Sequence, residues 1–239
     1  MRVCWWICCF LALVFSAAAA YAQGGGGGGT VIGLAGPQGI SGAPFSADVI
    51  QESTQLLPDG NRIHQETHGK TYRDSQGRMR TEQQIMGMGG SERFQSIHIF
   101  DPIEQVWIIL NPQDHTATIH HFGRPSSHPV PQLPTTEPKR QQPSLQVEPL
   151  GTKEIEGLTA TGRRTIRTIE AGEVGNDKPL VSAFESWFSP ELRTPLLSVT
   201  KDDRFGERTM RLVNIQRNEP DPALFQIPPD YQVKDQGLN

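Results

Sequence analysis

The chain has 239 residues, with 22 Lys and Arg against 26 Asp and Glu, so its formal net charge is −4. Hydrophobic residues make up 36% of it, and it contains 24 Gly and 19 Pro. This composition excludes a polytopic membrane protein, a basic nucleic-acid binder and a fully disordered chain.

Residues 1–22 have the features of a secretory signal peptide. Arg2 supplies the positive start, residues 4–15 form an unbroken apolar run, and an alanine-rich stretch follows. Because signal peptidases accept small residues before the cut, we expect cleavage between Ala22 and Gln23, which leaves no stable membrane span. The alternative is an uncleaved anchor, since the apolar stretch is at the short end of what spans a bilayer.

All three cysteines, Cys4, Cys8 and Cys9, lie inside this predicted signal peptide. The mature chain would therefore have no disulfide, no thiolate nucleophile and no cysteine-ligated metal. Its fold would depend on the burial of apolar side chains and on strand pairing.

Residues 23–44 are expected to form a flexible tether, because they begin with six consecutive glycines. From 45 to 122, alternation of apolar and polar residues is interrupted by turn signals such as Pro58-Asp59-Gly60-Asn61, and this pattern predicts six strands.

Residues 123–149 contain seven prolines, so we expect a proline-rich loop there. Five further strands are predicted after it, with one helical turn at Asp221-Pro222. The sequence thus predicts a mainly β domain of about eleven strands over residues 45–233, with few short helices and a C-terminal tail at 234–239.

Several tracts of the chain resemble exported proteins of Acidobacteria for which no function is established. These tracts are Tyr72–Arg78, Leu150–Gly157, Gly172–Asp177, Glu185–Leu192, Asp203–Glu207 and Glu219–Tyr231. More distantly, the layout of residues 45–233 and the ending Phe225-Gln226-Ile227-Pro228-Pro229-Asp230-Tyr231 are similar to the periplasmic lipoprotein-carrier and outer-membrane lipoprotein-sorting superfamily.

This resemblance implies a single curved antiparallel sheet, a half-barrel of about eleven strands around an apolar cavity. It also implies binding of a lipid or of a lipoprotein acyl chain. The superfamily covers its cavity with helices, whereas this sequence shows no strong helical periodicity.

Three histidines, His115, His120 and His121, lie close together in the sequence and could suggest a metal site. Their spacing along a strand does not support one. On one strand, His115 and His121 would share a face about 20 Å apart, and His120 would point to the opposite face. The sequence also lacks the Gly-x-Ser-x-Gly and His-Glu-x-x-His motifs. We therefore assign no catalytic residue, no metal ligand and no cofactor, and a histidine-dependent metalloenzyme is the least favoured function.

Apolar residues of the predicted strands are candidates for a concave, ligand-binding face. They are Ile97, Ile99, Trp107, Ile109, Phe184, Trp187 and Val199. A concave apolar face is filled either by a packed core or by an apolar ligand.

The favoured function is therefore a non-enzymatic, exported β-protein, periplasmic or secreted, that binds a lipid or lipoprotein acyl chain or an envelope protein. The alternative is a structural or sensing module of the envelope, in which the sheet is packed and holds no small ligand. Neither function involves nucleic acid.

Overall fold

The computed structural model describes residues 40–86, 93–122 and 144–237, all of which belong to one compact unit. The predicted signal peptide, its cleavage site, and most of the predicted tether and proline-rich loop lie outside these ranges. Within the described ranges, the protein contains no helix with the length and apolar character needed to cross a membrane.

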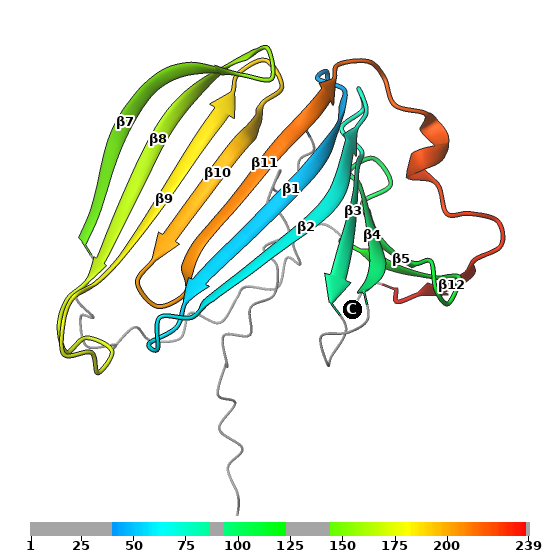
Figure 1. Ribbon diagram of the computed structural model, residues 1–239. Coiled ribbons are helices and arrows are strands. Elements are labelled where there is room, and N and C mark those ends of the chain that lie inside the picture. The colour runs from blue at the N-terminus through cyan, green and yellow to red at the C-terminus, as the bar shows by residue number, and fades with distance from the viewer. Residues whose placement is uncertain (1–39, 87–92, 123–143, 238–239) are drawn as a thin grey trace, which may run out of the picture. The chain divides into compact units, whose positions relative to one another are not determined.

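All the strands belong to one open, curved sheet (Figure 1), which confirms the predicted fold class. The sheet has twelve strands in the order β12-β6-β5-β4-β3-β2-β1-β11-β10-β9-β8-β7. Their bounds are β1 Phe45–Leu56, β2 Arg62–Arg73, β3 Met79–Met86, β4 Arg93–Asp101, β5 Val106–Asn111, β6 Thr116–His121, β7 Ser144–Ile155, β8 Leu158–Ile169, β9 Leu180–Ser189, β10 Thr194–Asp202, β11 Gly206–Gln216 and β12 Gln232–Asp235.

Two features of the sheet differ from the sequence expectation. β7 begins at Ser144, so the last residues of the expected proline-rich loop are strand. Pro149 is accommodated because it lies at a register shift in an edge strand, where its missing N–H interrupts no ladder. β12 is an additional strand that pairs in parallel with β6, whereas the other strand pairs are antiparallel.

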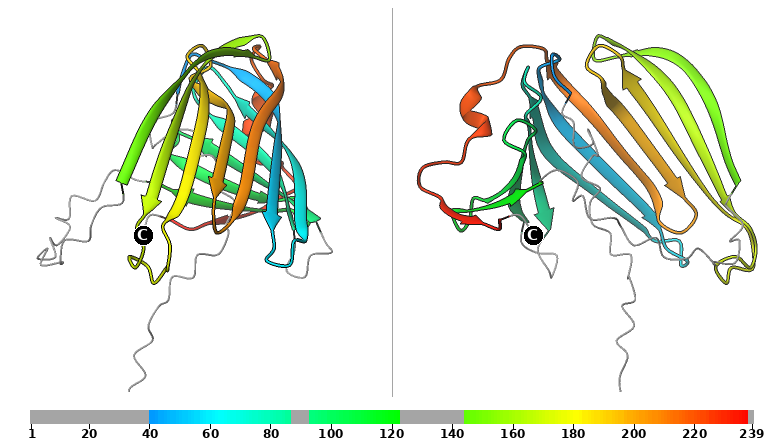
Figure 2. Two further views of the ribbon diagram at one scale, coloured as in Figure 1. Left: turned by 60° about the vertical axis from the view of Figure 1, so that its left-hand side comes forward. Right: turned by 180° about the vertical axis from the view of Figure 1, so that it is seen from behind.

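The sheet bends through β1 and β2, so that β3–β6 and β7–β10 turn toward the same side (Figure 2). We call the concave side the inner face and the convex side the outer face. The one helical element of the described ranges, η1 (Pro222–Phe225), runs along the outer side beside β3. Asp221 caps it by accepting a hydrogen bond from the Ala223 N–H at 2.9 Å, as its sequence suggested.

The position of η1 identifies the residues of the two faces. Phe225 packs against Ile97 and Ile99, so these side chains belong to the outer face. Because directly paired residues point to the same side of a sheet, the register extends this assignment from Ile97 to Glu82, then to Lys70 in β2.

Two apolar clusters hold the sheet together. One lies under η1 and includes Ile97, Ile99, Ile108, Leu110 and Phe225. The other gathers at the end of the sheet where β1 begins, and it consists of Phe45, Ala47, Val49, Leu158, Ala160, Leu192, Leu196 and Leu212.

Arg73 lies fully buried at that same end and joins three distant segments. Its Nε donates to the Ala43 carbonyl at 2.9 Å, and its Nη2 donates to the carbonyls of Ala43 and Leu192. The guanidinium stands 4.8 Å from the centre of the Phe45 ring. Burial, followed by the charge of Arg193, lowers the pKa of Arg73 to about 10.

The tract that contains Arg73 also anchors the C-terminal segment. Asp74 accepts backbone hydrogen bonds within its turn, and the Ser75 N–H donates to the Glu219 carboxylate at 3.0 Å. The Arg78 guanidinium lies over the Phe225 ring, 5.1 Å from its centre. Three of the tracts that carry the sequence resemblance, those around Arg73, Leu192 and Phe225, therefore meet here and position the strands.

Arg73→Met should lower the free energy of unfolding by about 3 kcal/mol, because two buried carbonyls lose their donor. Chemical denaturation measures this value. Arg62→Met is the matched control in the same strand, because Arg62 is exposed, and it should stay within about 0.5 kcal/mol of wild type. Equal stability of the two variants would contradict the structural role of Arg73.

Candidate ligand-binding face

The inner face of β7–β9 carries large apolar side chains that are open to solvent. Phe184 and Phe188 of β9 are 46% and 41% exposed. The register places Val147 of β7 and Thr165 of β8 in the same row as Phe184. Val147 is 50% exposed, so the row presents an apolar surface on this side of the sheet.

The opposite side of the bend contributes a second apolar surface from β5. Trp107 pairs with Phe100, and Ile109 pairs with His98, on the inner face of β4 and β5. The Trp107 indole is 38% exposed, and its ring centre lies 5.8 Å from that of His98.

Between these surfaces one row of the inner face is mostly polar, whereas Val49 and Leu212 beside it are apolar and buried. Ser186 of β9 pairs with Ser198 of β10, which pairs with Met210 of β11. The same row continues through Gln51 of β1 to Thr67 of β2. Hydroxyl and amide groups, together with Met210, thus lie along this row between the two apolar surfaces, and the inner face as a whole is amphipathic.

The seven residues expected to share a concave face are divided by the register. Trp107, Ile109 and Phe184 lie on the inner face. Ile97, Ile99, Trp187 and Val199 lie on the outer face, where Ile97 and Ile99 are buried beneath Phe225.

Trp187 has a structural environment on the outer face. Its ring lies against Gly162 of β8, and the Lys153 Nζ stands 3.8 Å from the ring centre. A Cβ atom at Gly162 would come within 2.6 Å of the indole, so only glycine fits there without movement.

Gly162→Ala should therefore destabilise the protein by about 1–3 kcal/mol, because the added methyl group displaces the Trp187 ring. Urea unfolding measures the change. In a Trp187→Leu background the same substitution should cost clearly less, because the two side chains are in contact. An undiminished cost in that background would show that the indole is not the obstacle.

Other apolar residues of the inner face were not among the candidates. Phe188 follows Phe184 by four residues in one strand, so alternation could have indicated it. Leu145 and Val147 were hidden by the proline content of their segment, which predicted a loop rather than an edge strand.

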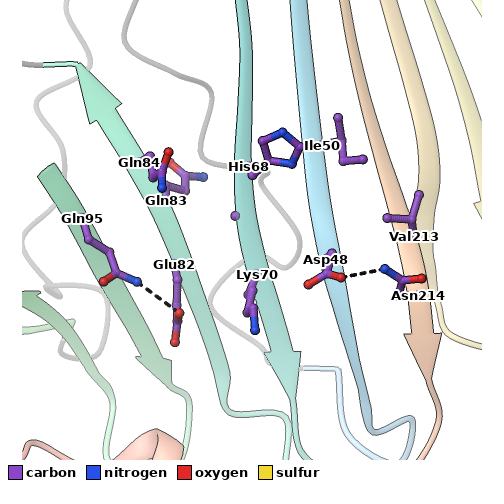
Figure 3. Close-up of a pocket in the computed structure, with 11 residues that line it drawn as sticks. Asp48, Ile50, His68, Lys70, Glu82, Gln83, Gln84, Gln95, Val213 and Asn214 are labelled. Carbon is purple, nitrogen blue, oxygen red and sulfur yellow. Dashed lines mark hydrogen bonds between the residues drawn. The ribbon is translucent and has the colours of Figure 1, made fainter. Parts of the chain in front are cut away.

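The outer face carries a shallow hollow of about 330 Å³ over β1–β4 and β11 (Figure 3). Its lining is mixed, and its carboxylates are already engaged. Asp48 accepts a hydrogen bond from Asn214 at 2.8 Å, and Glu82 accepts one from Gln95 at 3.2 Å. This arrangement leaves little capacity for an apolar ligand.

The histidines are dispersed rather than convergent. His115 pairs with Asp230 at 2.6 Å and His121 with Asp235 at 3.0 Å, so both hold the C-terminal segment against β6. In the part of the chain that the structure describes, no three His, Cys, Asp or Glu side chains gather as a metal site would require.

His98 has a half-buried imidazole on the inner face of β4. Ser96 Oγ and His98 Nε2 lie 2.9 Å apart, whereas the buried Nδ1 has no hydrogen-bond partner among the described residues. Burial lowers the pKa of the His98 imidazole below its ordinary value of 6.5. As the pH falls through about 6.5, the unfolded chain therefore takes up this proton before the folded protein does.

The contribution of His98 to stability should thus be complete above pH 6.5 and should decrease below it. Urea unfolding at pH 7.5 and 5.5 tests this by comparison of variants. Wild type should lose more stability between the two pH values than His98→Asn, whereas His120→Asn, at an exposed position, should behave as wild type does. Equal losses in wild type and His98→Asn would refute the assignment.

No protein-family model and no curated protein matches the chain. Among solved structures, the chain is similar to an uncharacterized conserved protein of Thermus thermophilus, with 15% identity, a TM-score of 0.45 and coverage of 82% of this chain and 91% of that one. It is similar at 13% identity to the structure of the MucA/MucB complex of Pseudomonas aeruginosa, with a TM-score of 0.44 and coverage of 80% of this chain and 58% of that one.

A third similarity is to a LolA-superfamily protein of Nitrosomonas europaea, with 9% identity and a TM-score of 0.33. It covers 79% of this chain and 92% of that one. The chain is thus distantly similar to a member of the lipoprotein-sorting class that the sequence resembles. Identities this low do not transfer a function, which must come from the residues themselves.

Proposed function

We propose that the protein is a non-enzymatic, exported β-protein that binds the acyl part of an amphiphilic ligand on the inner face of its sheet. The observation that carries this proposal is the exposure of Phe184, Phe188 and Trp107 on that face. The N-terminal signal-like sequence supports export, and the curved sheet supports a ligand site on its concave side.

The energetics favour an acyl ligand. Each buried CH₂ group contributes about 0.8 kcal/mol, so a chain of moderate length gains useful affinity from a shallow apolar surface. The inner face also offers hydroxyl groups between its apolar regions, and these suit the polar end of an amphiphile rather than a purely hydrocarbon ligand.

An envelope protein partner is the second candidate, and β7 favours it. β7 is the terminal strand of the sheet, and its Leu145 and Val147 are exposed. A partner could add a strand at this edge. Such binding would need the β7 backbone rather than the Phe184 ring, so substitution of Phe184 separates the two functions.

Phe184→Ser should weaken the binding of a dansyl-labelled fatty acid about tenfold, because it removes roughly 1.4 kcal/mol of apolar contact. Val181→Ser is the matched control, since Val181 lies on the outer face of the same strand with a similar exposure of 41%. Fluorescence titration should show the affinity of the control unchanged. Absence of binding by folded wild type, or equal losses in both variants, would refute the proposal.

A further inference from the structure

The charged side chains of β7–β11 are divided unequally between the two faces. On the outer face, basic residues are matched with acids. Arg164 Nη2 lies 2.6 Å from Glu185, Arg211 lies 3.0 Å from Glu52 and Lys201 lies 3.4 Å from Glu207. The charges of the outer face thus largely neutralise one another.

Three arginines of the inner face are not matched in this way. Arg163 and Arg167 of β8 pair in register with Ser186 and Ser182 of β9, and Arg208 of β11 pairs with Thr200 of β10. All three are exposed. Among the described residues, none of them has a carboxylate within 4.0 Å.

The acids nearest to these arginines on the inner face are occupied or remote. Asp202 is held by its own neighbour Arg204 at 2.9 Å. Glu154 pairs with Thr159, four residues before Arg163, which is about 13 Å along the strand. The inner face of β8–β11 is therefore locally positive in a chain whose net charge is −4.

The arginines surround the apolar surface proposed to bind an acyl chain. Phe184 pairs with Thr165, and Arg163 and Arg167 flank Thr165 on the same face. On the other side, Thr200 separates Phe184 from Arg208, a distance of about 10 Å across two strand spacings. Figure 1 shows β8–β11 as neighbouring strands of the sheet.

We infer that the ligand of the inner face is an anionic phospholipid-type amphiphile. Its acyl chain packs on Phe184 and Val147, and its phosphate is bound by Arg163, Arg167 and Arg208. Guanidinium groups bind phosphate oxygens through paired, charge-assisted hydrogen bonds, which gives them preference for this head group. This inference rests on the proposed function and adds the chemistry of the head group to it.

Isothermal titration of the full chain with two lysolipids tests the inference. Lysophosphatidylglycerol and lysophosphatidylcholine with the same acyl chain are compared below their critical micelle concentrations, because they differ in net charge at a common phosphate. Wild type should bind the anionic lipid about tenfold more tightly, which corresponds to about 1.4 kcal/mol. R163Q/R167Q and R208Q should each reduce this preference, and raised salt should weaken it in wild type.

R62Q is the control, because Arg62 is an exposed arginine of β2 whose register position is on the outer face. It should retain the full preference. Glycerol phosphate, which has no acyl chain, should bind at least about a hundredfold more weakly than the anionic lysolipid, because it gains nothing from the apolar surface. Comparable affinity for glycerol phosphate would overturn the inference, because the site would then recognise a free phosphate.

The possible results distinguish the inference about the anionic head group from the proposed binding of the acyl chain. Equal affinity of wild type for both lysolipids, or an undiminished preference in R163Q/R167Q and R208Q, overturns the head-group inference and leaves the acyl site in place. If neither lysolipid binds to folded wild type, both proposals fail. Binding of both lysolipids that is about tenfold weaker in Phe184→Ser, with the preference for the anionic lipid preserved in R62Q and reduced in R163Q/R167Q and R208Q, supports both proposals.

Discussion

The alternation of side chains along each strand is the constraint on which the rest of this structure depends. One hydrogen-bonded sheet contains all twelve strands, so the register carries the face of each residue from strand to strand. A slip of one residue between β8 and β9 would move Phe184 to the side of the matched ion pairs and would bring Glu185 to the apolar side. The apolar surface proposed to bind a ligand lies on the inner face only because this register is maintained.

Arg73 shows how the register is fixed at one end of the sheet. A buried guanidinium is costly unless its donors are satisfied. Here backbone carbonyls from two distant segments accept hydrogen bonds from Nε and Nη2, whereas the buried Nη1 has no partner among the described residues. The strand ends around Ala43 and Leu192 cannot move apart without separating at least one of those carbonyls from this donor. Three of the tracts that carry the sequence resemblance thus have a structural role around Arg73, and the proposed ligand-binding surface lies elsewhere, on Phe184 and its neighbours.

The sequence allowed most strands to be predicted, but not the faces of the candidate residues. Alternation shows which residues of one strand share a side, as it does for Trp107 and Ile109. It does not relate one strand to the next, so Ile97 was grouped with Trp107, although the register pairs Trp107 with Phe100 and thereby places the two on opposite faces. That relation depends on the number of residues in the turn between the strands.

Long-range pairing was similarly hidden from the sequence. β12 joins β6 from the far end of the chain, and its side chains have no pattern that identifies this partner. The packing of η1 over Ile97 and Ile99 is likewise a contact between segments far apart in the sequence, and the sequence does not predict it. Without it, these two residues look like a binding surface, and only the folded chain shows that the protein itself occupies that surface.

The two faces of β9 and its neighbouring strands differ in whether their apolar and charged side chains have partners within the protein. On the outer face, Trp187 is covered by Lys153, and Glu185 is neutralised by Arg164. On the inner face, Phe184 has no comparable cover, and nearby Arg163 has no carboxylate within ion-pair distance among the described residues. A net negative chain does not attract anions over long distances, so selection of an anion must come from local contacts. An amphiphile with one apolar chain and one anionic group would cover the Phe184 ring and also pair with Arg163. A neutral hydrocarbon would do only the first, and a free anion only the second.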